Sequence, residues 1–196
     1  MLFISAARKR YTPRVMEHNK ETNLVWIDLE MSGLNPKTDV ILEAALIVTT
    51  GDLEILEESP SYLVHQPEEI LSMMSKEVVD LHSHSGLLER LKSATLSVSD
   101  VEMALLETIK KQVAPGASPL CGNSIFSDRS FIKNYMPTLN SYLHYRHIDV
   151  STIKELYKRW CPDGPMFEKK GTHQTLEDIR ESITELEFYR RNFFKK

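Results

Sequence analysis

Four acidic residues and a histidine give this chain the side chains needed to hydrolyse a phosphodiester with metal ions. They are Asp28, Glu30, Asp128, Asp178 and His173. Carboxylate oxygens are hard ligands, which favour Mg²⁺ or Mn²⁺ over zinc. Two such cations about 4 Å apart can activate a water and stabilise the charge that grows on the leaving oxygen. A neutral imidazole beside that water can take its proton. We therefore expect the four acids to be metal ligands and His173 to be the general base.

The spacing of the first two acids predicts that they share one face of a strand. Asp28 and Glu30 close the apolar run at residues 24–27. Side chains alternate along a strand, so both carboxylates point to one face and Leu29 points to the other. Charges at the end of a buried strand are costly unless they are paired, hydrogen-bonded or bound to metal. Any one acid alone also fits an ordinary surface or first-turn position. Their joint occurrence favours the metal site.

Composition restricts the class of protein. A chain of 196 residues suits one compact α/β domain. A formal net charge of -4 and a pI of 6.0 argue against a protein that coats long nucleic acid by bulk charge. The two cysteines, Cys121 and Cys161, lack metal-ligand spacing and indicate a reducing compartment. The longest strongly apolar stretch, residues 44–48, is far shorter than the roughly 20 residues of a membrane-spanning helix.

Hydrophobic periodicity predicts a mixed α/β fold. Three strands at residues 23–30, 40–49 and 61–65 would form an antiparallel meander. Two further short strands, at residues 120–121 and 147–150, alternate with helices. One expected helix spans residues 99–113. Ser127 would cap a second helix, Ser151 or Thr152 would cap a third, and a final helix would carry an apolar stripe at Leu176, Ile179, Ile183 and Leu186. We therefore expect a five-stranded mixed sheet flanked by helices.

The amino-terminal segment has a different composition from the rest. Its first twenty residues carry five basic residues and a single acid, Glu17. The basic residues are Arg8, Lys9, Arg10, Arg14 and Lys20. This composition is typical of a mitochondrial transit segment. The alternative is a basic tail, and translation from Met16 would omit most of it. We therefore divide the chain into a leader at residues 1–22 and a main domain at residues 23–196, located in the mitochondrion, the cytoplasm or both.

Four stretches of this sequence resemble one enzyme family. Residues 26–34, 121–128, 144–152 and 171–182 resemble oligoribonuclease, the branch of the four-acid exonuclease superfamily with histidine in its third motif. The resemblance runs in order from residue 23 to the end. It implies a ribonuclease H-like fold and a homodimer that trims very short RNAs, dinucleotides above all, from the 3′ end to nucleoside 5′-monophosphates. It also implies two Mg²⁺ or Mn²⁺ ions on the four acids.

The same resemblance implies a set of substrate contacts. Leu34 would wedge against a base, and His82 would lie beside the bound nucleotide. The 5′ phosphate would be capped by Ser124, Ser151 and Arg146, with Tyr145 and Arg146 reaching in from the partner subunit. Apart from the resemblance, the Tyr145-Arg146 pair fits an ordinary surface connection between a helix and a strand.

The chain departs from the family pattern at Glu77. Counting back from Ser85-Gly86-Leu87, Glu77 occupies the position where the family carries a tryptophan that stacks on a base. Loss of that stacking predicts dinucleotide binding weaker by about ten- to a hundredfold. Two other functions are therefore considered. One is a non-catalytic RNA-binding paralogue, and the other is a DNA-trimming exonuclease with the same catalytic set.

Overall fold

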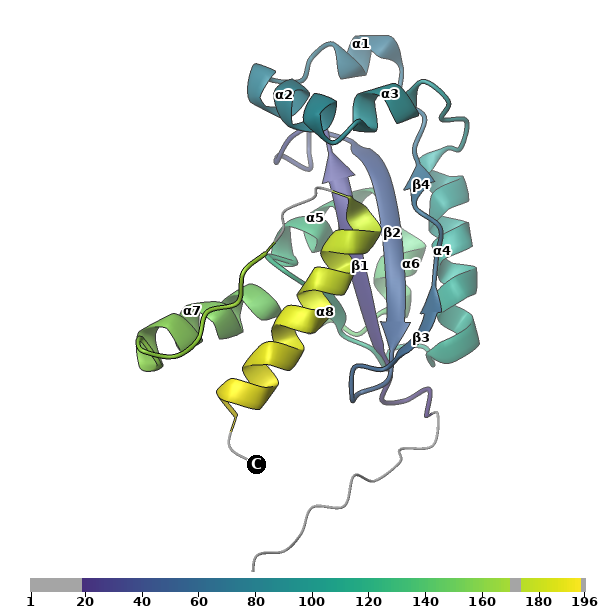
Figure 1. Cartoon of the computed structure of the whole chain (residues 1–196). Helices are drawn as coiled ribbons and strands as arrows, with labels where there is room; N and C mark the ends of the chain where they lie inside the picture. The colour runs from purple at the N-terminus through teal and green to yellow at the C-terminus, as the bar shows by residue number, and fades with distance from the viewer. Residues whose placement is uncertain (1–18, 170–173, 195–196) are drawn as a thin grey trace, which may run out of the picture.

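A mixed six-stranded sheet forms the centre of the computed structural model, which describes residues 19–169 and 174–194 (Figure 1). The strands are β1 (Leu24–Met31), β2 (Ile41–Thr49), β3 (Ile55–Glu58), β4 (Tyr62–Leu63), β5 (Leu120–Gly122) and β6 (His147–Asp149). Their order is β3-β2-β1-β5-β6, and β4 also pairs with β2. Pairing is antiparallel among β1, β2, β3 and β4 and parallel from β1 through β5 to β6. The predicted meander with added parallel strands is confirmed.

The sheet has six strands where five were predicted. The predicted strand at residues 61–65 contains β4, and β3 is an additional strand that also pairs with β2. β3 and β4 both pair with β2, on either side of Ser59 and Pro60. The backbone N–H of Leu46 donates to the Ser59 hydroxyl at 2.9 Å, which interrupts the regular ladder. Pro60 offers no N–H to continue it. β3 was missed because Ile-Leu-Glu-Glu lacks the alternation that marks a half-buried strand.

Eight helices lie among the described residues. They are α1 (Glu68–Leu71), α2 (Lys76–His84), α3 (Leu87–Leu91), α4 (Val98–Gln112), α5 (Phe126–Tyr135), α6 (Pro137–Tyr142), α7 (Val150–Trp160) and α8 (Thr175–Asn192). The predicted helix at 99–113 is confirmed as α4, which begins with a capping box between Ser97 and Asp100. No helix of the described chain combines the length and the apolar character needed to cross a membrane.

Two predicted helix caps are wrong. Ser127 lies inside α5, and the residue before the helix, Ile125, provides no side-chain cap. α7 is capped by Asp149, not by Ser151 or Thr152. The Asp149 carboxylate accepts from the backbone N–H of Ser151 at 2.9 Å, as an aspartate does at an N-cap.

The two faces of β1 enter two different cores. Val25, Ile27 and Leu29 pack with residues of α4, α5 and α6. Trp26 packs on the opposite face with residues of α7 and α8. Because side chains alternate, Asp28 and Glu30 lie on the α8 face. Figure 1 shows α8 crossing this face, with its first turn close to the end of β1 and below α2 and α3.

Candidate active site

Three of the predicted acids meet where the end of β1 faces the first turn of α8. Asp28, Glu30 and Asp178 each offer one carboxylate oxygen, and these oxygens lie within 4.8 Å of one another. The strand period aims the first two at α8, and the helix supplies the third from its first turn. Sequence spacing predicted the first pair, and the fold brings Asp178 to it across about 150 residues of chain.

These carboxyl groups are held where negative charge is unfavourable. Burial raises the pKa of Glu30 from its ordinary value of 4.5 to about 7, with further contributions from Glu43, Asp178 and Asp128. Burial, and then the nearby charges of Asp128, Glu30 and Asp178, raises the pKa of Asp28 well above its usual range. A bound divalent cation would remove this repulsion. The donor set, oxygen only and close together, therefore fits Mg²⁺ or Mn²⁺.

Asp128 lies beside these three acids and is not one of the mutually close set. It is buried in the first turn of α5, and its Oδ1 accepts from the backbone N–H of Leu29 at 3.1 Å. Burial raises its pKa to about 7, although hydrogen bonds from its own N–H and that of Leu29 oppose the rise. Its charge also raises the pKa of Asp28. The bond to Leu29 thus fixes Asp128 against the strand that carries Asp28 and Glu30.

The predicted general base, His173, lies outside the described residues. The residues that follow it are well anchored at the start of α8. Thr175 is buried, and its hydroxyl lies 2.5 Å from the Ser61 hydroxyl. Ser61 in turn donates to Glu43 at 2.6 Å. This chain of hydrogen bonds ties the first turn of α8 to β2.

His82 lies next to the carboxylates, on the side of α2. Its side chain is buried, and its Nε2 lies 2.8 Å from the carbonyl oxygen of Met31, so Nε2 carries the proton that it donates. Its Nδ1 lies 3.8 Å from Glu30 Oε2 and has no hydrogen-bond partner in the described part of the chain. The predicted position of His82 beside the reaction centre is consistent with this geometry.

Sequence reasoning missed one ion pair at the site. Glu43 is 1% exposed and pairs directly with Glu30 across β1 and β2. Both of its carboxylate oxygens accept from the Arg90 guanidinium of α3, with Nη2 to Oε2 at 2.9 Å. The signal was present, because a glutamate inside the apolar run Ile-Leu-Glu-Ala-Ala-Leu requires a partner that neutralises its charge. The identity of that partner depends on tertiary structure.

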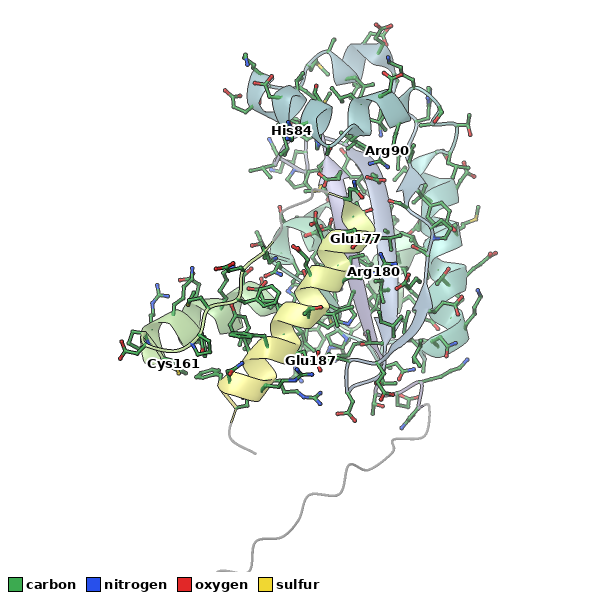
Figure 2. All side chains as sticks on the ribbon, viewed as in Figure 1. His84, Arg90, Cys161, Glu177, Arg180 and Glu187 are labelled. Atoms are coloured by element: carbon green, nitrogen blue, oxygen red, sulfur yellow. The ribbon has the colours of Figure 1, made fainter. Side chains whose placement is uncertain are left out.

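An open cavity of about 590 Å³ adjoins this ion pair and lies between α3 and α8 (Figure 2). Its lining includes Arg90, Glu177 and Arg180. Arg180 contacts Glu177 and also Glu58, whose Oε2 lies 2.5 Å from Nη2. Both arginines among the described residues of the lining are therefore paired with acids, so this part of the cavity does not present a basic surface to an anion.

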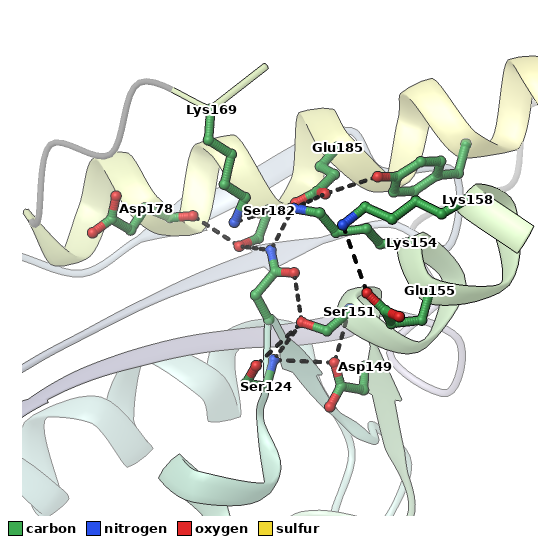
Figure 3. Close-up of polar contacts among 12 residues, drawn as sticks. Ser124, Asp149, Ser151, Lys154, Glu155, Lys158, Lys169, Asp178, Ser182 and Glu185 are labelled. Atoms are coloured by element: carbon green, nitrogen blue, oxygen red, sulfur yellow. Dashed lines mark hydrogen bonds and ion pairs between the residues drawn. The ribbon is translucent and has the colours of Figure 1, made fainter. Parts of the chain in front are cut away.

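Two predicted phosphate-binding serines lie together at the start of α7 (Figure 3). The backbone N–H of Ser124 contacts Ser151 Oγ at 2.9 Å and Asp149 Oδ1 at 3.0 Å. The two serine hydroxyls lie 3.2 Å apart. Ser124 has a φ of 50°, a conformation that a non-glycine residue adopts only when its surroundings hold it there. The structure thus brings together two residues that are 27 positions apart.

The remaining predicted contacts lie on the surface. Leu34 is 80% exposed just after β1, and Tyr145 is 72% exposed just before β6. The Arg146 guanidinium lies over the Tyr145 ring, 5.4 Å from its centroid. Glu77 is fully exposed in the first turn of α2, where hydrogen bonds from its own backbone N–H and from Ser75 lower its pKa. It is a charged helix-start residue and has no aromatic surface.

Comparison with known proteins defines the class first. The exonuclease family designated RNase_T matches residues 25–186. Among solved structures, the exonuclease I–ssDNA complex of Escherichia coli has a TM-score of 0.69 at 12% identity, and exonuclease I of Methylocaldum szegediense has 0.65 at 16%. They cover 87% and 86% of this chain, which spans about 40% of each of theirs. The fold is therefore that of a ribonuclease H-like exonuclease.

The sequence relatives are more specific. Oligoribonuclease of Ruthia magnifica is 53% identical over 176 residues, covering 89% of this chain and 98% of that protein. Oligoribonuclease of Escherichia coli K12 is 52% identical over 178 residues, covering 89% and 97%. The chain belongs to the oligoribonuclease family of exonucleases.

Proposed function

We propose that this 3′-to-5′ exoribonuclease acts on very short RNA, above all dinucleotides, and releases nucleoside 5′-monophosphates. The observation that carries the proposal is the carboxylate group of Asp28, Glu30 and Asp178, whose oxygens lie within 4.8 Å of one another in a chain about half identical to oligoribonucleases. The same residues on an unrelated fold would indicate only a cation site.

Asp28, Glu30, Asp128 and Asp178 would hold two Mg²⁺ or Mn²⁺ ions. When bound, these ions supply an activated water and stabilise the negative charge on the leaving oxygen. The protein's own contribution is to fix the carboxylates before substrate arrives. β1 holds two of them, and the Asp128 bond to Leu29 holds a third. His173 would take the proton of the attacking water.

The substrate would be confined at both ends. Leu34 would wedge against a base, and His82 would lie beside the bound nucleotide. Ser124 and Ser151 would contact the 5′ phosphate. Tyr145 and Arg146 would come from the partner subunit of a homodimer. This last assignment is supported by the exposure of Tyr145 and by its place beside β6, the last strand in the sheet order. A closed 5′ end would leave no room for a longer strand and would explain a preference for dinucleotides.

The test compares a 5′-labelled RNA dinucleotide with a seven-nucleotide RNA and a DNA dinucleotide, in Mg²⁺, in Mn²⁺ and in chelator. Metal-dependent turnover that strongly favours the RNA dinucleotide supports the proposal. Equal cleavage of both RNA lengths would show that length selection is lost with the tryptophan that Glu77 replaces. Preference for DNA would support a DNA-trimming enzyme, and no cleavage of any substrate would support a non-catalytic paralogue.

We further propose that residues 1–22 are a leader that directs the domain at 23–196 to the mitochondrion, and that protein started at Met16 stays in the cytoplasm. The support is compositional, because residues 1–22 carry five basic residues and two acids. Fusing residues 1–22 to a fluorescent protein, with and without Arg8, Lys9 and Arg10 changed to Glu, tests the leader. Cytoplasmic fluorescence from the unchanged fusion would disprove it.

A further inference from the structure

A network of largely buried polar groups connects Ser124 and Ser151 with α8 (Figure 3). At its centre is Asn123, the last residue before Ser124. The Asn123 Nδ2 donates to Ser182 Oγ at 2.8 Å and to Glu185 Oε2 at 3.1 Å, both on α8. Its Oδ1 accepts from Ser151 Oγ at 3.0 Å. The side chain therefore connects the helix that carries Asp178 with the serines at the start of α7.

Glu185 determines the orientation of the Asn123 side-chain amide, that is, which end is Nδ2 and which is Oδ1. The Glu185 side chain is 0% exposed and is held by Lys154 Nζ at 3.3 Å, Lys169 Nζ at 3.2 Å and the Tyr189 hydroxyl at 2.9 Å. Burial acts to raise its pKa, but Lys169, Tyr189 and Lys154 outweigh burial and the pKa is lowered. Glu185 is therefore a carboxylate, which only accepts hydrogen bonds, so the NH₂ end of Asn123 must face it.

The direction of every later hydrogen bond follows from this orientation. Because Asn123 Oδ1 faces Ser151 and can only accept, the Ser151 hydroxyl must donate its one proton to it. The lone pairs of Ser151 then accept from the backbone N–H of Ser124 at 2.9 Å. Of the two hydroxyls 3.2 Å apart, only Ser124 still has a proton to donate. That proton can turn from Ser151 to an incoming anion without breaking the network.

We propose that Asn123 is a positioning residue that makes the Ser124 hydroxyl the donor for the terminal 5′ phosphate of a short RNA. The inference rests on the proposed function, because it assumes that the 5′ phosphate binds beside the two serines, of which Ser124 has the free hydroxyl proton. It adds a role for α8 besides carrying Asp178. Ser182 donates to the Asp178 carbonyl at 2.9 Å, so the same turn of helix that places a metal ligand also holds the amide that orders the phosphate site.

The test is the preference for a 5′-phosphorylated dinucleotide, pApA, over the same dinucleotide with a 5′ hydroxyl, ApA. We expect Asn123→Ala to lower the ratio of kcat/KM on pApA to that on ApA by about tenfold, the loss of one hydrogen bond to a charged group. We expect kcat/KM on ApA to fall by much less than that on pApA, because ApA has no 5′ phosphate to bind. The ratio is independent of the fraction of folded enzyme, because the same molecules cleave both substrates. Asn192→Ala is the matched control, since its amide donates to one exposed carbonyl at the far end of α8.

A double-mutant cycle separates positioning from simple structural support. If Asn123 acts through the Ser151 hydroxyl, Ser151→Ala should lower the ratio to a similar extent, and the double variant should be no worse than Ser151→Ala alone. Additive losses, an equal fall on both substrates, or an unchanged ratio in Asn123→Ala would overturn the inference. So would an unaltered enzyme that cleaves pApA and ApA equally, although the proposed function would stand. An unaltered enzyme that cleaves neither substrate would overturn both the inference and the proposed function.

Discussion

At the scale of single residues, the site is a set of acids whose charges oppose one another. Asp28, Glu30, Asp128 and Asp178 come from three elements, and the charges of the last three all raise the pKa of Asp28. The Glu43–Arg90 pair adds opposing effects, because Glu43 raises the pKa of Glu30 and Arg90 lowers it. The folded chain therefore carries a destabilising concentration of charge that metal binding would relieve.

Asp128→Asn tests the role of the buried acid on α5. Asparagine keeps an oxygen that can accept from the Leu29 N–H, so the fold should persist while the negative charge is lost. We expect turnover of the dinucleotide to fall by about a hundredfold or more and the thermal midpoint to remain near that of the unaltered protein. The exposed Asp80, changed to Asn in the same way, should leave turnover unaltered. Near-normal turnover in Asp128→Asn would disprove the assignment of this residue to the metal site.

The pH dependence of stability tests the crowding of the carboxylates. The folded state raises the pKa of Glu30 from 4.5 to about 7, so between these values the folded chain binds more protons than the unfolded chain. The free energy of unfolding of metal-free protein should therefore fall as pH rises through this window. Glu30→Gln should reduce that fall by about 3 kcal/mol at most. Denaturant unfolding in chelator at about pH 5 and about pH 7.5 measures it. Equal slopes in both proteins would contradict the burial of this charge.

At the scale of elements, period-two alternation was enough to predict β1, because its apolar run and its two acids obey one rule. The joint packing of α8 and β1 was predicted only through the family resemblance, since residues 28 and 178 are too far apart for any local signal. α1, α2 and α3 were not predicted. They are short, with a small apolar cluster of Leu42, Leu87 and Leu91 beneath them, so no long periodic pattern marks them. Likewise, no sequence pattern identifies Arg90 as the partner of Glu43.

α2 is the element where the sequence departs from the family pattern. Glu77 lies fully exposed in its first turn, so the position can accept a large side chain without disturbing a core. We expect Glu77→Trp to tighten dinucleotide binding by about ten- to a hundredfold, because an aromatic ring adds base stacking and a repulsive carboxylate is removed. Calorimetric titration of the dinucleotide into Asp128→Asn protein, with and without Glu77→Trp, measures this affinity without cleavage. Glu69→Trp, an exposed position on α1, is the control. Unchanged affinity in Glu77→Trp would mean that another surface supports the base.

At the scale of the whole molecule, the sheet order separates the acids from Tyr145 and Arg146, two of the residues predicted to cap the substrate. The acids lie on β1, near the middle of the sheet, and on α5 and α8. Tyr145 and Arg146 precede β6 at the end of the strand order and point to no core of their own chain. Two-fold pairing of identical chains places the same surface of each on the other. A surface that does not contribute to the site of its own subunit can therefore complete the site of its partner.

Complementation between two inactive variants tests this arrangement directly. Asp128→Asn lacks a site acid but keeps Tyr145 and Arg146, whereas Arg146→Ala keeps every acid. If each site takes its acids from one subunit and Arg146 from the other, a mixed dimer contains one complete site. Random exchange of equal amounts should then restore about a quarter of the unaltered activity, because half of the dimers are mixed and each has one complete site of two. A mixture of Asp128→Asn and Asp178→Asn should restore no activity, since each site of the mixed dimer still lacks one of its acids. Activity no greater than the average of the two parents would show that each chain builds its site alone, and the exposed Tyr145-Arg146 pair would then be an ordinary surface connection before β6.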